Sequence, residues 1–360
     1  MKVLYIGNYR DGTGWANACI NNILALDSAG VDVVPRAITF EAQQQNYPSR
    51  IKILESASTE GCDVCIQHTL PHLYSYDSRY KNIAFLAVES SHFKDTGWQH
   101  NINLMDELWV PSNAAKASCE NSGVNIPIKV APHSLDISKY QKENGGNKIE
   151  EMLPTFNFAF IGEFIERKNL QALIRAFHLE FDFQEPVNLL IKTSKVELPQ
   201  IQDYIKHVKS GLKIRSRYRE EIIIAGRLEE KDYVSVLGQC HSFVMPSRGE
   251  AFCIPALEAM SLGIPVIHTA NTGMDDFCIG ASVESSSVPC LGAVSTISNL
   301  DTARSEWQEI NIKKLCSAMR EAYQKWNSQE SQEDSEKVKV HASGYDHANV
   351  GKQLKELLND

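Results

Sequence analysis

The 360-residue chain is expected to fold as an α/β protein made of two doubly wound domains, each with a parallel sheet. Short strand-like runs alternate with helical patterns along most of the sequence, which is typical of parallel sheets covered by helices on both faces. The length allows roughly two domains, each with its own core. A polar stretch at residues 141–151 interrupts the alternation and predicts a linker between them.

In the first domain, β-rich runs alternate with helical patterns from the N-terminus onward. The expected strands are residues 2–7, 31–37, 63–67, 82–88, 107–110 and 128–131. The expected helices are residues 15–30, stopped by a glycine, 50–59, and 112–122, which has a serine cap.

After the linker the alternation restarts, which predicts a second sheet of the same kind. Its expected strands are residues 156–161, 187–192, 222–225, 242–245 and 265–268, and its expected helices include 169–177 and 198–212. The acidic stretch 327–337 has low hydrophobicity and is expected to be solvated or loose. A short helix at 350–358 ends the pattern.

Composition excludes several classes of protein. Apolar residues make up 43% and charged residues 22%, as in an ordinary globular enzyme. The net charge is −9 and no long basic block occurs, so a nucleic-acid partner is not expected. No apolar run is long enough to cross a bilayer, and the first strand begins without the apolar core of a signal peptide, so a cytoplasmic location is expected.

The nine cysteines are odd in number and scattered, which argues against a disulfide framework. Cys62 and Cys65 have metal-like spacing, but no second pair accompanies them, and alternation along a strand explains them better.

Two glutamates in the second domain carry the strongest chemical signal. Glu250 and Glu258 flank an apolar loop, and Pro255 between them suits the first position of a helix. Glu258 is expected on the first turn of that helix, which Gly263 helps to end. A helix N-terminus can hold a phosphate, and carboxylates accept hydrogen bonds from sugar hydroxyls. The pattern therefore predicts a sugar-nucleotide site, whereas the plain alternative is a buried helix with two incidental acidic ends.

A second signal follows the strand at residues 156–161. Arg167 and Lys168 lie between this strand and the next helix, which places cations at the edge of the sheet where ligands bind. Cations are unfavourable at a helix N-terminus, so the pair favours an anionic ligand. The alternative is an ordinary exposed first turn.

The segment from Ser247 to Met260, with Met245-Pro246 before it and Gly263-Ile264-Pro265-Val266 after it, resembles the Glu–seven residues–Glu signature of retaining glycosyltransferases of family 4. This resemblance implies the GT-B fold, in which two Rossmann-like domains face each other across a cleft. It implies an acceptor-side domain at residues 1–145 and a donor-binding domain at 152–344. A C-terminal helix within 345–360 would pack back on the first domain.

The resemblance also implies roles for individual residues. Glu250 would hold hydroxyls of the donor sugar, Glu258 would hold the ribose, and the backbone amides of Ala251 and Phe252 would hold the outer phosphate. Lys168 would neutralise the negative charge that develops on the leaving phosphate.

One position departs from the family pattern. The family has an arginine just after the glycine that ends the strand at residues 156–161, and here Glu163 takes its place. Arg167 is the candidate to compensate, although adjacent positions at a helix start point in different directions.

Two features of the first domain match the family less closely. Gly12 and Gly14 map approximately onto a glycine-rich loop that admits donor phosphate and acceptor, with a plain turn as the alternative. His68 follows a strand, in a context where the family has a histidine that reaches the transferred sugar. A lone histidine is otherwise more often structural.

The implied function is transfer of a sugar from a nucleoside diphosphate sugar to a hydroxyl of a glycan, a lipid-linked glycan or a protein-linked glycan, with retention of configuration. The sequence has no Asp-x-Asp at a strand end, so no metal or other cofactor is expected. A sugar-nucleotide epimerase or hydrolase of the same fold and a non-catalytic nucleotide-sugar-binding relative remain alternatives. Peripheral membrane contact also stays open.

Overall fold

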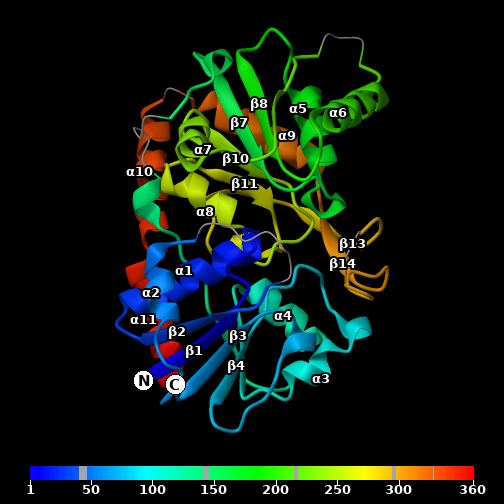
Figure 1. Ribbon diagram of the computed structural model, residues 1–360. Coiled ribbons are helices and arrows are strands. Elements are labelled where there is room, and N and C mark those ends of the chain that lie inside the picture. Colours follow the sequence, from blue (N-terminus) through cyan, green and yellow to red (C-terminus); the bar gives the residue numbers. More distant parts are fainter. Residues whose placement is uncertain (40–46, 141–145, 215–217, 294–296, 327) are drawn as a thin grey trace. The chain divides into compact units, whose positions relative to one another are not determined.

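The computed structural model describes residues 1–39, 47–140, 146–214, 218–293, 297–326 and 328–360. It divides into two compact units (Figure 1). Unit 1 comprises Met1–Asp136, Ser295–Glu306 and Gly344–Asp360, and unit 2 comprises Ile137–Val294 and Trp307–Ser343. The first five residues of the expected linker, 141–145, lie outside the described residues.

Unit 2 begins at Ile137, before the expected end of the first domain at 145, and Ser295–Glu306, expected in the second domain, belong to unit 1. Residues after 145 are bonded to unit 2. The backbone N–H of Asn147 donates to the Asp232 carboxylate at 2.9 Å, and Ser235 Oγ donates to the Gly146 carbonyl at 3.1 Å. Ile149 exchanges two hydrogen bonds with the Gln239 side-chain amide.

Unit 1 contains a six-stranded sheet in the order β2-β1-β3-β4-β5-β6, with every described pair parallel. Its strands are β1 (Lys2–Gly7), β2 (Asp32–Ala37), β3 (Val64–His68), β4 (Lys81–Phe85), β5 (Glu107–Val110) and β6 (Ile128–Val130). β3 and β5 are buried at every position, as strands covered on both faces are. The expected strand at 82–88 ends three residues early.

The helices of unit 1 are α1 (Gly14–Ser28), α2 (Ser49–Glu55), α3 (Trp98–Ile102), α4 (Asn113–Asn121) and α11 (His347–Asn359). The predicted serine cap is confirmed, because Ser112 Oγ accepts a hydrogen bond from the Ala115 N–H. The helix expected at 50–59 is shorter and ends at Glu55. α11 packs along α1, so the C-terminal helix is part of unit 1.

Unit 2 contains a second six-stranded parallel sheet, in the order β12-β11-β10-β7-β8-β9. Its strands are β7 (Phe156–Ile161), β8 (Val187–Thr193), β9 (Ile222–Ala225), β10 (Ser242–Met245), β11 (Val266–Thr269) and β12 (Gly280–Val283). β7 and β10, the central pair, are completely buried. This order is that of a Rossmann sheet.

Helices cover both faces of this sheet (Figure 1). They are α5 (Leu170–Glu180), α6 (Leu198–Leu212), α7 (Glu230–Leu237), α8 (Ile254–Ser261), α9 (Ile312–Gln324) and α10 (Gln329–Ser343). α5 packs between α6 and α9, and α8 packs against α10. A separate two-stranded sheet pairs β13 (Ser285–Pro289) with β14 (Glu306–Ile310).

Of the two expectations for residues 327–337, solvated or loose, the second is wrong for the described residues, because residues 329 onward form α10, whereas none of residues 329–337 is buried. Most of its side chains are polar, and none of the polar ones is buried, so its sequence shows no strong apolar face. The helix is nevertheless fixed by Val338 and Ala342, which are fully buried. Gly263 also lets α10 approach closely, since a Cβ at Gly263 would lie 2.4 Å from Ser335 Oγ.

Among the described residues, no helix is long and apolar enough to cross a membrane. None of the nine cysteines, all of which lie among the described residues, forms a disulfide bond. Cys62 and Cys65 pack with Leu4 and Val34 in a small apolar cluster, which accounts for their spacing.

Candidate functional site

The direction of winding in the unit 2 sheet reverses between β7 and β10. From β7 the chain proceeds outward through β8 and β9, and from β10 it proceeds the other way through β11 and β12. In open α/β sheets ligands bind at the carboxyl ends of the strands beside such a reversal. The segments that leave β7 and β10 at this point carry the residues that the sequence singled out.

A cluster of opposite charges joins these two segments. Lys168 Nζ lies 2.6 Å from Glu250 Oε1, and Arg167 contacts the same oxygen at 3.3 Å and the Gly249 carbonyl at 2.5 Å. The Glu250 side chain is only 6% exposed. Burial alone would raise the pKa of Glu250, but the two cations outweigh it, and the pKa is lowered.

Arg167 and Lys168 belong to a short 3₁₀ turn, η5 (Glu166–Lys168), and they do not point apart as expected. Both reach Glu250 because a buried carboxylate is stable only when cations or hydrogen-bond donors surround it. The backbone also fixes this approach, since the N–H of Arg248 donates to the Arg167 carbonyl at 2.7 Å. Glu163, which stands where the family has arginine, pairs with Lys195 at an exposed site.

The loop after Glu250 leads into α8. Ala251 and Phe252 are buried, and the Phe252 ring stacks on Phe277 with centroids 4.2 Å apart. Cys253 precedes the helix with a φ of +86°, a strained conformation for a residue with a side chain. Since α8 begins at Ile254, Glu258 lies beyond the first turn, and its expected placement on that turn is wrong.

Glu258 is held by two tyrosines that the sequence did not reveal. The Tyr140 hydroxyl donates to Glu258 Oε1 at 2.8 Å, and the Tyr233 hydroxyl donates to Oε2. Burial raises the pKa of Glu258, and the two hydrogen bonds oppose that rise. Burial lowers the pKa of Lys192, near the end of β8, and the nearby Glu258 carboxylate opposes part of that shift.

A short turn after β11 is hydrogen-bonded to the backbone of the loop that carries Glu250. In η6 (Gly273–Asp276), the N–H of Gly273 donates to the Glu250 carbonyl at 2.8 Å. Asp275 organises this turn, because it accepts hydrogen bonds from Ser282 Oγ at 2.7 Å and the Asn271 N–H at 2.6 Å, and contacts His268 Nε2 at 3.0 Å.

Asp275 should make the stability of unit 2 sensitive to acid. Burial alone would raise the pKa of Asp275, but the hydrogen bonds from His268, Ser282 and Asn271 lower it to about 2 from an ordinary 3.8. A lowered carboxyl pKa stabilises the fold above about pH 4, and that contribution is lost as pH falls toward 2. Urea unfolding at several pH values should show Asp275→Asn less stable than wild type at pH 6, with the gap shrinking below pH 4.

The exposed Asp203 provides the matched control for that comparison, since its side chain is 78% exposed. Asp203→Asn should leave the unfolding free energy within about 0.5 kcal/mol of wild type. A gap for Asp275→Asn that stays constant from pH 6 to pH 3 would contradict the assignment.

Unit 1 has its own reversal of winding, between β1 and β3. His68 is the last residue of β3 rather than the first after it, and it is completely buried. Its Nδ1 lies 2.7 Å from the Tyr5 hydroxyl, and its ring stacks on Phe85 with centroids 4.2 Å apart. Among the described residues, His68 Nε2 has no hydrogen-bond partner. Burial, together with nearby His133, lowers the pKa of His68 well below its usual value, so the ring is neutral at pH 7.

The loop after β1 lies at the same reversal. Gly12 adopts a φ of +65°, which glycine tolerates without strain. Thr13 caps α1, since its Oγ1 accepts a hydrogen bond from the Ala16 N–H at 3.2 Å, and Gly14 is the first residue of the helix. A Cβ at Gly14 would meet nothing within 4 Å, so space remains beside it. The loop therefore caps α1 and leaves open space beside Gly14.

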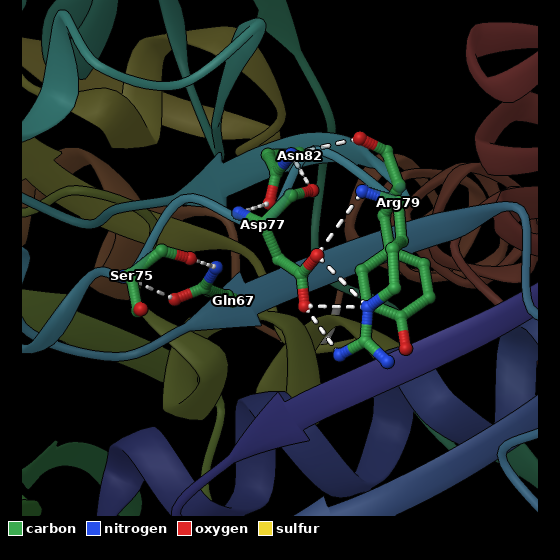
Figure 2. A network of polar contacts seen from close by, with 6 residues as sticks. Gln67, Ser75, Asp77, Arg79 and Asn82 are labelled. Atoms are coloured by element: carbon green, nitrogen blue, oxygen red, sulfur yellow. Dashed lines mark hydrogen bonds and ion pairs between the residues drawn. The ribbon is translucent and has the colours of Figure 1, made fainter.

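The segment after His68 is held in place by a network of polar side chains (Figure 2). The Gln67 side-chain amide exchanges two hydrogen bonds with the backbone of Ser75, at 2.7 and 3.0 Å. Asp77 is bonded to Arg79 at 2.6 Å, and the Asn82 side chain bonds the Asp77 backbone. The loop that carries the chain away from His68 is thus ordered by its own polar groups.

Comparison with known proteins agrees with this geometry. Residues 146–281 match the family model of "Glycosyl transferases group 1", and residues 227–355 match that of "Family 4 Glycosyltransferase in conflict systems". Together these matches span residues 146–355, and this part of the chain is similar to group 1, family 4 glycosyltransferases. The resemblance to that family is confirmed.

Relatives with curated descriptions cover only part of the chain. The serotype-specific mannosyltransferase WbdA of Escherichia coli is 30% identical over 116 residues, which are 31% of this chain and 13% of the relative. An uncharacterized glycosyltransferase of Methanocaldococcus jannaschii is 30% identical over 126 residues, 34% of this chain and 32% of its own. The matched part of this chain thus spans about an eighth to a third of the length of these relatives.

Among solved structures, Anabaena HepE, crystallised with UDP and with UDP-glucose, has the same fold over the whole chain. The TM-scores are 0.62 and 0.63 at 15% identity, with 100% of this chain and 99% or more of HepE covered. The expectation of two Rossmann-like domains of the GT-B class is confirmed by this likeness and by the two parallel sheets.

Proposed function

We propose that this protein transfers a sugar from a nucleoside diphosphate sugar to an acceptor hydroxyl. The observation that carries the proposal is the convergence of Lys168 and Arg167 on Glu250 where the winding of the unit 2 sheet reverses. Two cations that contact one carboxylate leave an excess of positive charge, which suits a diphosphate. The adjacent start of α8 adds N–H groups that favour an anion.

Each residue of this cluster has a distinct part in the proposed reaction. Cleavage of the sugar–phosphate bond leaves negative charge on the diphosphate, and the Lys168 ammonium, supported by Arg167, stabilises that charge. Glu250 orients Lys168 and presents its carboxylate to the donor sugar hydroxyls. The amides of Ala251 and Phe252 bind the outer phosphate, and Glu258 binds the ribose hydroxyls.

The proposal extends to unit 1 through His68. A neutral imidazole whose Nδ1 is engaged by Tyr5 presents Nε2 as its remaining polar atom, and a sugar hydroxyl can either donate to it or accept from it. Gly12 and Gly14 would leave room for the diphosphate and the acceptor. The acceptor is proposed to be a hydroxyl of a glycan, free or attached to a lipid or protein.

Retention of the anomeric configuration and independence from metal ions are also proposed. Both follow the family resemblance, and the second is supported by the protein's own cations at the leaving-group position, which can take the role of a divalent ion. An epimerase or hydrolase would use the same nucleotide contacts, so only the products separate these reactions from transfer.

The first test is incubation of the purified chain with a panel of nucleoside diphosphate sugars, with and without EDTA, in the presence of simple glycans. Nucleotide release that requires one donor, needs an acceptor and resists EDTA would support the proposal, and the anomeric configuration of the product would be read by NMR. Free sugar or an epimer as the only product would overturn transfer in favour of the alternatives. Binding of a nucleoside diphosphate, seen as a raised melting temperature, with no turnover on any acceptor would indicate a non-catalytic relative.

A further inference from the structure

The carboxylate of Glu258 has both oxygens occupied by protein hydroxyl groups. Tyr140 donates to Oε1 at 2.8 Å and Tyr233 donates to Oε2. A carboxylate that accepts two hydroxyl groups is the arrangement needed to bind two neighbouring hydroxyls of a sugar or ribose. Glu258 therefore already binds hydroxyl groups, and the chain itself provides them.

The two tyrosines differ in how they are supported. Tyr233 lies within α7, and its neighbours Val234, Val236 and Leu237 are buried, so its position is fixed by the packing of that helix. Tyr140 instead follows η3 (Ile137–Lys139) and belongs to no regular element. The preceding Lys139 forms an exposed ion pair with Glu230 of α7. Because Tyr140 lies outside the helices and strands, where local movement costs less than within a packed helix, we take Tyr140 as the tyrosine that moves.

We infer that Glu258 and Tyr233 form a fixed hydroxyl-binding subsite and that Tyr140 is its internal occupant, which a nucleotide ribose hydroxyl displaces. This inference rests on the proposed function, because it takes the bound molecule to be a nucleoside diphosphate. Tyr233 is a positioning residue: its hydrogen bond holds Oε2 and turns Oε1 toward the ligand. The Tyr140 hydroxyl occupies Oε1 in the absence of nucleotide and competes with the ribose.

The two tyrosines are therefore expected to affect nucleotide affinity in opposite directions. Without the Tyr140 hydroxyl, binding no longer has to break a hydrogen bond to Glu258, so Tyr140→Phe should bind nucleoside diphosphate about 2- to 12-fold more tightly. Without the Tyr233 hydroxyl the carboxylate loses its orientation, so Tyr233→Phe should bind about 2- to 12-fold more weakly. Both changes remove a single oxygen atom from the same chemical environment.

The test is calorimetric titration of the full chain with the nucleoside diphosphate that binds wild type, and with its 2′,3′-dideoxy analogue. The tighter binding of Tyr140→Phe should vanish with the analogue, which has no ribose hydroxyl to take Oε1. Tyr323→Phe is the matched control, since Tyr323 packs among Phe156, Phe181 and Trp326 instead of contacting Glu258, and its affinity should equal that of wild type.

A pH series separates positioning by Tyr233 from a general loss of structure. The hydrogen bond from Tyr233 opposes the rise in the pKa of Glu258, so Tyr233→Phe should lose nucleotide binding at a higher pH than wild type as the solution is acidified. A structural defect alone would weaken binding equally at every pH.

The outcomes separate this inference from the proposed function. Weaker or unchanged binding by Tyr140→Phe, while wild type binds, would overturn the inference and leave the function intact. Equal gains with the ribose and dideoxy ligands would also overturn it, because the competition would not involve the ribose hydroxyls. Failure of every variant, including wild type, to bind any nucleoside diphosphate would overturn both.

Discussion

Lys168→Ala should reduce the rate of sugar transfer by about a hundred- to a thousandfold, the usual loss when one donor to a developing negative charge is removed. The loss should appear mainly in kcat, because the leaving phosphate carries more negative charge in the transition state than in the bound donor. The measurement is steady-state nucleotide release with the donor and acceptor identified by the panel. A folded Lys168→Ala protein with more than a tenth of wild-type kcat would contradict the role of Lys168.

The same substitution should also lower stability, because Glu250 is buried and would lose its nearest cation. Adding Glu250→Gln removes the uncompensated charge, so the double variant should regain melting temperature while transfer stays lost. This separates the chemical role of Lys168 from its structural role. Lys195→Ala is the matched control, since Lys195 forms an exposed pair with Glu163 and should leave both rate and stability nearly unchanged.

Arg167 and Lys168 show how far sequence reasoning could go. Their position after a buried strand indicates the edge of the sheet, and the strand predicted at 156–161 is confirmed to the residue because five of its six residues are apolar. The contact of both side chains with the Glu250 carboxylate could not be predicted, because it depends on the loop after β10, which lies some eighty residues later in the chain. Only the order of strands brings the two segments together.

The two tyrosines that donate hydrogen bonds to Glu258 could not be predicted from the sequence. Tyr233 lies on a helix that the sequence did not predict, and Tyr140 lies next to the expected linker. Neither belongs to a motif, and a single tyrosine in a helix or loop usually contributes only to packing. A hydrogen bond from such a residue is a property of tertiary structure, so periodicity and composition carry no signal for it.

The prediction for the segment that forms α10 was wrong for a different physical reason. Its acidic, weakly hydrophobic sequence is typical of a solvated or loose segment, because the pattern offers few apolar residues to bury. The helix is held by two buried side chains and by its close approach to Gly263, which follows α8. A helix secured by a few contacts at well-placed positions gives little hydrophobic periodicity.

Gly351→Ala should destabilise unit 1, although alanine is intrinsically the better helix former by about 1 kcal/mol. Gly351 lies in α11 against α1, and a Cβ there would stand 2.1 Å from the Ala25 carbonyl oxygen. Since the obstacle is backbone, α11 must move away, which loosens the contacts of Val350 and Leu354 with the core. Overpacking of this kind costs about 1–3 kcal/mol.

Thermal unfolding followed by circular dichroism should show this cost as a melting temperature several degrees lower for Gly351→Ala, at about 2–4 °C per kcal/mol. Gln353→Ala, an exposed change on the same helix, provides the control and should leave the melting temperature the same or slightly higher. The helix propensity of alanine acts at both positions, and only Gly351 faces a backbone carbonyl. An increase in stability at Gly351 would therefore mean that α11 does not pack against α1 at the distance described, because propensity would then be the only effect left.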